Sequence, residues 1–219
     1  ETGTRLNGDA IEVFLQLAPG ESCILQTSDK ALTGAEYPFY QTAAPAALNG
    51  KWDVAFTTGG PLMPAPLKQI ELGPWTSHAG EAYQTFSGTA VYSTSFSKPV
   101  SGAKTFLLDL GKVEETATVW LNGKKLQTLI GPSFQLIIPA SQLLAKNSLK
   151  IEVTNGMQNR IIDLEKKGVV WKKFYNINFS NRLPENKGPD GVFTAVHWKP
   201  AESGLVGPVT LTAAEPVKK

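Results

Sequence analysis

Residues 105–155 decide the fold, and they read TFLLDLGKVEETATVWLNGKKLQTLIGPSFQLIIPASQLLAKNSLKIEVTN. Within this stretch, residues 116–121 (TATVWL) place an apolar side chain at every second position, which is the period of a β-strand with one buried face. Asn122 and Gly123 follow, and residues 124–130 (KKLQTLI) form a second apolar-patterned run. Asn-Gly between two such runs is the strongest short-range hairpin signal, because a type I′ turn needs a positive φ at both central residues. The stretch therefore predicts a β-hairpin.

The same alternation extends outward from this hairpin. Residues 149–153 (LKIEV) put three apolar side chains on one face, and residues 106–110 (FLLDL) form another strand candidate. The pattern is typical of an antiparallel sheet with one buried and one wet face. Further strands are expected at residues 51–57, 67–72, 86–96, 133–138, 192–198 and 206–213. Some ten short strands separated by turn residues predict an all-β sandwich or jelly roll, with a helix at residues 157–167.

The N-terminal region carries a hairpin of its own. Residues 10–17 (AIEVFLQL) alternate, residues 18–21 form a turn, and residues 22–27 (SCILQT) provide the second strand. An isolated hairpin is marginal in water, so this one is expected to dock on the main body or to be the last piece of a preceding β-sandwich. The predicted organisation is therefore a hairpin with a linker at 1–45, a jelly roll at 46–215 and a tail at 216–219.

Composition excludes several classes of protein. The chain has 219 residues, 42% of them hydrophobic and 18% charged, with a formal net charge of +2 and scattered basic residues. A nucleic-acid binder would show a clustered basic face, so nucleic acid is not an expected partner. The single cysteine, Cys23, excludes an intrachain disulfide. The sequence contains no apolar run long enough for a membrane span, and its start at Glu1 suggests a mature chain or a fragment.

A family resemblance appears in the order and spacing of short motifs. They are WDV at 52–54, LGPWT at 72–76, FSGTAVY at 86–92, LDLGKV at 108–113, ATVWLNG at 117–123, GPSF at 131–134, NSL at 147–149, EVTN at 152–155, NR at 159–160 and SGLVGPV at 203–209. The chain resembles the galactose-binding-like jelly roll of large glycoside hydrolases over about residues 11–211. It is similar to the sugar-binding domain of family 2 enzymes and still more to the C-terminal region of family 106 α-L-rhamnosidases. There, a segment like residues 15–23 (LQLAPGESC) precedes the jelly roll and belongs to a β-sandwich.

The resemblance implies an accessory role. In those enzymes the catalytic carboxylates sit on a separate (β/α)₈ barrel, which needs about 250 residues. The chain is therefore expected to be non-catalytic by itself, and to bind carbohydrate or pack against the catalytic domain of an α-L-rhamnosidase-like parent acting on plant or host polysaccharide. The resemblance also implies a secreted or periplasmic bacterial protein. Jelly rolls of this class often hold a structural calcium ion, for which the available oxygen donors are Asp53, Asp109, Asp163 and Asp190.

No catalytic residue can be assigned from the sequence. Glycosidases need two carboxylates facing each other across the scissile bond, whereas Glu114 and Glu115 are adjacent and would point to opposite faces of an extended chain. His78 and His197 lie far apart, with no acidic residue at metal-ligand spacing. A free-standing enzyme would need loop carboxylates that only folding brings together.

Carbohydrate binding is the sharper hypothesis, because sugars need an aromatic ring for their C–H face and planar polar groups for their hydroxyls. Such groups sit best on loops carried by a rigid sandwich. The candidates are Trp75, His78, Asn159, Arg160, Trp171 and Tyr175. The alternative is a structural or protein-interaction module in which Trp75 plugs the sandwich, Arg160 anchors a loop, and Trp120 lies under residues 169–179 or a partner domain. Solvent access to Trp75, Trp171 and Tyr175 on one concave surface distinguishes the two hypotheses.

Overall fold

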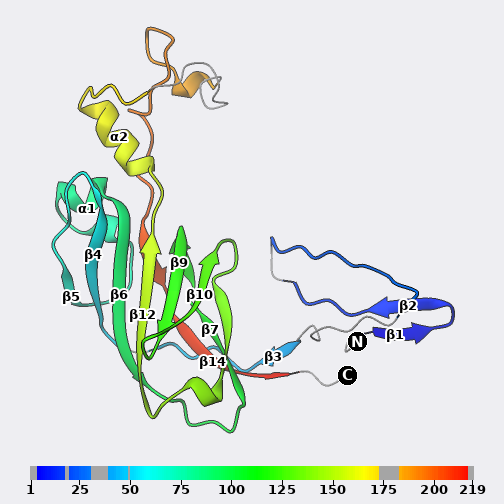
Figure 1. The fold of residues 1–219 in the computed structure, drawn as a ribbon. Coiled ribbons are helices and arrows are strands. Elements are labelled where there is room, and N and C mark those ends of the chain that lie inside the picture. The colour runs from blue at the N-terminus through cyan, green and yellow to red at the C-terminus, as the bar shows by residue number, and fades with distance from the viewer. Residues whose placement is uncertain (1–3, 18–19, 31–38, 49, 173–182, 217–219) are drawn as a thin grey trace.

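The computed structural model describes residues 4–17, 20–30, 39–48, 50–172 and 183–216. Two antiparallel sheets enclose the core, as the alternating pattern predicts (Figure 1). The larger has the order β10-β9-β12-β6-β4-β5, with bounds Lys124–Ile130, Thr116–Leu121, Lys146–Thr154, Ser87–Ser97, Trp52–Gly60 and Leu67–Ile70. The smaller has the order β11-β7-β14-β3, with bounds Gln135–Pro139, Thr105–Asp109, Thr210–Pro216 and Tyr40–Thr42. A short pair joins β13 (Gly204–Gly207) to β8 (Lys112–Glu114).

The predicted central hairpin is confirmed. β9 and β10 pair antiparallel across the turn, where Asn122 has a φ of 52° and Gly123 a φ of 81°. The Asn122 side chain is held by Asn147, whose Oδ1 accepts a hydrogen bond from Asn122 Nδ2 at 2.9 Å. The backbone N–H of Asn122 donates to the Ser148 carbonyl at 2.9 Å. The turn is therefore fixed both by its own backbone preference and by contact with β12.

Residues 105–155 do not all enter one sheet. β9, β10 and β12 belong to the larger sheet, whereas β7 pairs with β11 and β14 in the smaller one. Every second side chain along β7, β9 and β12 is buried between the sheets. The stretch decides the fold because it supplies strands to both layers and most of the apolar surface between them.

The inner faces of both sheets form one core. Its largest fully buried side chains are Trp52, Trp75, Tyr92, Phe86, Phe106, Leu108, Leu110, Ile138, Leu149, Ile151, Leu205 and Leu211. At one end Phe56, Trp75 and Phe86 pack edge to face, with ring centroids 5.2–5.8 Å apart. Such pairs are stabilised beyond the area that they bury, so these rings close that end of the sandwich.

The N-terminal hairpin differs from the predicted one. β1 (Thr4–Asn7) pairs with β2 (Ala10–Val13) around Gly8 and Asp9, and residues 22–27 form no strand. The turn at Gly8 needs only two residues, whereas the predicted pairing must close four. On this N-terminal arm (described residues 4–17 and 20–30), side chains at residues 7–17 and 20–30 are exposed apart from the half-buried Glu12, with Ile24 96% accessible. Figure 1 shows the hairpin beside the sandwich and apart from it.

Contacts of Gln16 and Phe14 help to attach the N-terminal arm to the sandwich. The Gln16 amide binds the backbone of Tyr40, donating to its carbonyl at 2.9 Å and accepting from its N–H at 3.0 Å. The Phe14 ring meets Phe39 edge to face at 4.7 Å. Tyr40 begins β3, which pairs with β14 and so adds a strand from the region 1–45 to the sandwich. Gln16 thus covers the open edge of β3, as edge strands in soluble proteins require.

The C-terminal expectations need one correction. Residues 192–198 were predicted to be a strand, but apart from a single bridge between Lys187 and Phe193 they form turns and irregular chain. Residues 206–213 divide into β13 and β14 at Pro208, which has no N–H for a ladder hydrogen bond. The predicted helix is present as α2 (Gln158–Lys166).

Candidate functional site

Most sequence-predicted site residues gather at one end of the sandwich. That end carries the short helical turn Trp75–Ser77, α1 (Glu81–Thr85), α2 and the turn Pro184–Asn186 (Figure 1). Loops at the end of a rigid sandwich are suited to binding. The side chains there, however, have different roles from one another, and several are structural.

Trp75 is not a ligand platform. Its side chain is 1% exposed, its ring packs on Phe56 and Phe86, and its backbone N–H donates to the Ser203 carbonyl at 2.9 Å. In this structure the ring fills the end of the sandwich, where the alternative interpretation places it, and offers no accessible face to a sugar. His78 follows it with a half-buried ring tilted against Tyr83 at 5.6 Å.

Asn159 is also structural. It is 4% exposed, and its amide binds the backbone of Ala201, donating to the carbonyl and accepting from the N–H, each at 2.8 Å. The same nitrogen lies 3.4 Å from Ser203 Oγ. With its donors and its acceptor facing the chain that leads into β13, this side chain holds α2 on the sandwich and cannot reach a ligand.

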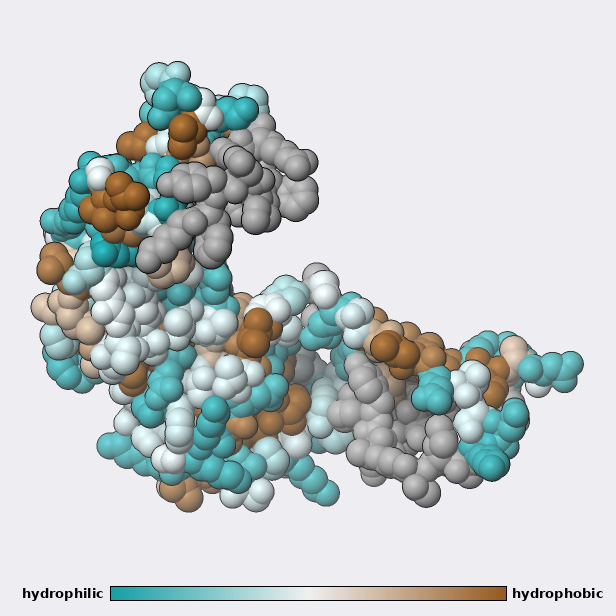
Figure 2. All heavy atoms as spheres, turned by 45° about the horizontal axis from the view of Figure 1, so that its top comes forward, coloured by the Kyte–Doolittle hydropathy of each residue, from teal (hydrophilic) through white to brown (hydrophobic). Residues whose placement is uncertain are grey.

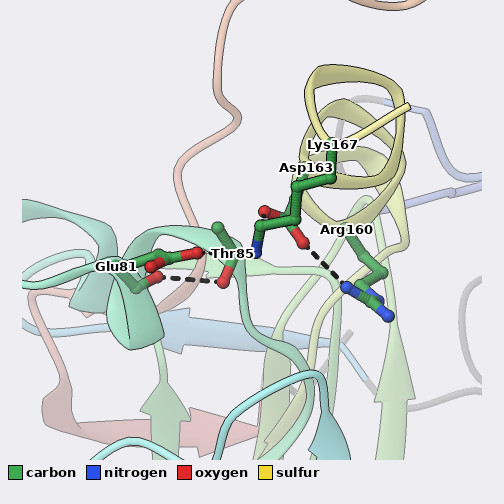
Figure 3. Close-up of polar contacts among 5 residues, drawn as sticks. All are labelled: Glu81, Thr85, Arg160, Asp163 and Lys167. Atoms are coloured by element: carbon green, nitrogen blue, oxygen red, sulfur yellow. Dashed lines mark hydrogen bonds and ion pairs between the residues drawn. The ribbon is translucent and has the colours of Figure 1, made fainter. Parts of the chain in front are cut away.

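Arg160 belongs to a charged cluster between α1 and α2 (Figure 3). Its guanidinium bonds Asp163 at 2.8 Å, and Lys167 bridges Asp163 at 2.7 Å and Glu81 at 2.6 Å. The Asp163 side chain is only 5% exposed. The hydrogen bonds that the Lys167 ammonium donates to Asp163 and Glu81 raise the pKa of Lys167. Breaking a buried ion pair is costly, so Lys167, which bridges Asp163 and Glu81, joins the two helices. The ion pair of Arg160 itself lies within α2 and differs from the loop anchor expected from the sequence.

The accessible aromatic side chains form a different group, which we call the aromatic cap: Trp171, Phe193 and Trp198. All three are half-buried. Phe193 meets Trp171 edge to face at 6.4 Å and Trp198 at 5.7 Å. Trp198 Nε1 donates to Asn186 Oδ1 at 2.7 Å, which ties the cap to the Pro184–Asn186 turn. Of the three rings, sequence reasoning selected only Trp171 as a ligand contact.

Glu165 on α2 organises the aromatic cap. Its Oε1 accepts from Trp171 Nε1 at 2.6 Å and lies 3.1 Å from Lys172 Nζ, and its Oε2 accepts from Thr194 Oγ1 at 2.9 Å. Burial raises the pKa of Glu165, but the hydrogen bonds from Thr194, Trp171 and Lys172 outweigh burial and hold the pKa below its ordinary value of 4.5. No linear spacing points to Glu165, because its partners lie 6 to 29 residues away.

The cap is therefore expected to open in acid. Because the folded pKa of Glu165 is lowered, its stabilisation is complete above pH 4.5 and disappears as the pH falls through the lower, folded value. Tryptophan fluorescence of the chain should stay constant from pH 7 to 5 and change below pH 4.5, while far-ultraviolet circular dichroism is retained. Glu165→Gln should remove this transition and destabilise the cap at pH 7 by about 1–3 kcal/mol. Glu185→Gln, at an exposed position nearby, is the matched control; an unchanged transition in Glu165→Gln would contradict the assignment.

The predicted site is divided by α2. Arg160, Asp163 and Lys167 share one face of the helix at i, i+3 and i+7 spacing, and that face meets α1. Glu165 lies about 140° around the helix axis from Arg160, on the side that meets Trp171. Arg160 and Trp171 therefore do not face one common ligand. Tyr175 lies outside the described residues.

The expected calcium donors do not converge. Asp53 binds Lys68 and Gln69, Asp109 binds Gln135 and the Gly111 N–H, Asp163 binds two cations, and Asp190 accepts from the Val192 N–H. Within the part of the chain that the structure describes, no three acidic, histidine or cysteine side chains come together at metal-ligand distances. In the described part of the chain these four carboxylates therefore do not form a calcium site together. No described helix is long and apolar enough to cross a membrane.

Comparison with known proteins agrees with this architecture. No family model matches the sequence. A putative β-glucuronidase of Formosa agariphila is 33% identical over 190 residues, which are 76% of this chain and 15% of that protein. The rhamnosidase from Novosphingobium sp. PP1Y superposes with a TM-score of 0.57 at 27% identity, covering 94% of this chain and 17% of its own. A β-glucuronidase from Ruminococcus gnavus gives 0.45 at 19% identity, covering 86% and 31%.

The chain thus spans about one sixth of the length of the first two relatives. The rhamnosidase likeness covers 94% of this chain. The chain therefore folds as an antiparallel β-sandwich that is similar to a part of large glycoside hydrolases, as its motif order predicts.

Proposed function

We propose that this chain is a non-catalytic accessory domain that contacts carbohydrate through the aromatic cap. The observation that carries the proposal is the orientation of Trp171, whose indole N–H is held by Glu165 and whose ring packs against Phe193. A binding ring is most effective when a second layer of contacts fixes it before the ligand arrives. The cap sits on loops above a rigid sandwich, where binding residues concentrate.

The chemistry of the cap suits a sugar. A saccharide presents a C–H face to a ring and hydroxyl groups to planar polar side chains, and binding sites combine apolar walls with a few such groups. Trp171 supplies the ring, and the Lys172 ammonium lies beside it through its contacts with Trp171 and Phe193. Trp and Tyr are enriched where a rigid contact area must be formed at small entropic cost.

The parent enzyme is proposed from its relatives. Their names indicate activity on rhamnosides and glucuronides, so we expect a secreted or periplasmic, α-L-rhamnosidase-like enzyme acting on plant or host polysaccharide. The catalytic domain of that enzyme would be the second partner of this chain. On this proposal the N-terminal arm is the last piece of a preceding β-sandwich, which would cover its exposed Ile11 and Ile24 side chains.

Calorimetric titration with oligosaccharides tests the cap. The 219-residue chain should bind a rhamnose- or uronate-containing oligosaccharide saturably, and Trp171→Ala should weaken binding at least about 10-fold, as truncation of a central aromatic anchor does. Trp171→Phe keeps a ring but removes the hydrogen bond to Glu165, so its affinity should fall between those of wild type and Trp171→Ala. His78→Ala, on the α1 side of α2, is the control and should leave affinity unchanged. Equal affinities of wild type and Trp171→Ala would refute the cap as the site.

Exposed aliphatic side chains favour a second candidate function, which is packing against the rest of a parent enzyme. Val170 is 87% exposed beside the aromatic cap, and Ile24 is 96% exposed on the arm. Figure 2 shows hydrophobic side chains on the surface of both regions. A folded chain that binds no oligosaccharide, yet gains thermal stability when joined to the catalytic domain, would support this function over sugar binding.

A further inference from the structure

The outer face of the larger sheet is a second candidate binding surface. Its outward side chains form rows across the strands. One row runs from Lys125 on β10 through Trp120 on β9, Lys150 on β12 and Ser93 on β6 to Asp53 on β4. A sheet that faced only water would not need a tryptophan in the middle of such a row, because large aromatic side chains are mostly buried or used in contacts.

A groove of about 500 Å³ crosses this face, within the size range of small-ligand sites. Ser93, Ser95 and Ser148 line its floor, and Ser95 lies directly opposite Ser148 in the strand register. Asp53 and Gln69 line one wall, and Lys150 the other. Among the residues that the structure describes, the hydroxyls of the three serines have no protein hydrogen-bond partner, so they can both donate to and accept from a ligand.

The wall opposite Lys150 is held in place. Asp53 Oδ1 accepts from the backbone N–H of Gln69 at 3.0 Å and from its side chain at 3.2 Å, and Asp53 Oδ2 lies 3.2 Å from Lys68 Nζ. Gln69 has a φ of 53°, a conformation that non-glycine residues adopt rarely. The carboxylate and the amide are therefore fixed at the groove margin instead of moving freely over the sheet.

Trp120 lies just beyond Lys150. It is half-buried, and its indole N–H is enclosed without a partner in the described residues. The Lys150 ammonium sits 4.2 Å from the ring centroid and 2.9 Å from Glu152 Oε1. Among the described residues the Lys150 side chain lies over the Trp120 ring, whereas most of the segment 169–179 expected there from the sequence lies outside the described residues. Cation–π contacts at exposed sites are weak, so a ligand can displace this one.

We propose that this groove binds an oligosaccharide chain, with Trp120 as its stacking ring and Lys150 as a displaceable cover that retains its bond to Glu152. The lining of hydroxyl, carboxylate, amide and ammonium groups matches a polyhydroxylated ligand. The site is separate from the aromatic cap and does not depend on it, since no groove residue lies in α2 or after it.

The test is titration of the 219-residue chain with xylohexaose, cellohexaose and a galacturonate hexamer, followed by calorimetry and tryptophan fluorescence. One of these probes should bind saturably. Trp120→Ala and Asp53→Ala should each weaken that binding at least about 10-fold, with unchanged circular dichroism. Lys150→Ala should expose the ring, which would appear as stronger acrylamide quenching of tryptophan fluorescence and as binding at least as tight as that of the wild type.

Two further variants keep the result decisive. Ser95→Lys fills the groove floor at an exposed strand position without removing a packed side chain, so it should block binding even if Trp120→Ala does not fold. Trp171→Ala, in the aromatic cap, should leave groove binding unchanged. If Trp171→Ala loses oligosaccharide binding while Trp120→Ala and Ser95→Lys keep it, the aromatic cap is supported as the site and the groove proposal is overturned. If Trp120→Ala and Ser95→Lys lose binding while Trp171→Ala keeps it, the groove proposal is supported. Absence of binding by all three probes would overturn the groove proposal.

Discussion

Trp75→Ala is expected to lower the free energy of unfolding by about 3–5 kcal/mol, the usual cost of truncating a buried tryptophan. The side chain is 1% exposed and fills the end of the core against Phe56 and Phe86. Its removal leaves a cavity that neighbouring strands can only partly close, because protein interiors are packed as densely as organic crystals. Urea denaturation followed by circular dichroism measures the change.

Trp171→Ala is the matched control, because the same substitution is made in a half-buried ring outside the core. It should cost much less stability than Trp75→Ala. The comparison also bears on function, since any loss of sugar binding in Trp75→Ala would come from unfolding and should vanish when affinity is corrected for the folded fraction. A Trp75→Ala protein as stable as wild type would contradict the assignment of this ring to the core.

Gly204→Ala is expected to destabilise the sandwich by about 2–4 kcal/mol, the sum of overpacking and backbone strain. A Cβ at this position would lie 2.3 Å from Tyr92 Oη and 2.8 Å from the Trp75 ring, and the φ of Gly204 is +110°. Both neighbours are rigid buried aromatic side chains. The glycine of the SGLVGPV motif is therefore required by close approach of the backbone to the core. Thermal unfolding and urea denaturation both report the effect.

Gly102→Ala provides the control, because a Cβ there meets no atom within 4 Å. It should unfold like wild type. If Gly204→Ala were as stable as wild type, the Tyr92 and Trp75 rings would have moved apart without loss of packing. That result would contradict the tight packing assigned to this end of the core. Gly204→Ala should also raise the accessibility of Trp75 to quenchers, which distinguishes a local shift from general loosening.

Local sequence patterns predicted the elements whose signals lie close together in the chain. The Asn122-Gly123 turn, the alternation in β9 and β12 and the helix α2 all follow from a few neighbouring residues. Predictions from the local pattern were wrong where the strand-pairing partner had to be identified. Residues 10–13 pair with Thr4–Asn7 instead of residues 22–27, and residues 192–198 form no strand. Apolar residues such as Val192 and Val196 resemble a strand in sequence but lie exposed in turns.

The candidate site shows the same division. Sequence reasoning selected aromatic, amide and guanidinium groups on the loops at one end of a sandwich, and most of them lie there. It could not rank them, because burial depends on which distant segment covers each side chain. Asn159 is occupied by Ala201, Arg160 by Asp163, and Trp171 by Glu165, and only the last pairing leaves a ring partly accessible.

By itself, the sequence determined that this is an all-β sandwich with one central hairpin and one helix, because strand and helix periods are properties of consecutive residues. Only the tertiary structure decided what each polar and aromatic side chain does. Trp75 and Gly204 lie 129 residues apart yet meet in the core, and Trp120 lies opposite Lys150, at the margin of a groove built from four other strands. Such contacts depend on how the sheets stack and where strands end, and that information is spread over the whole chain.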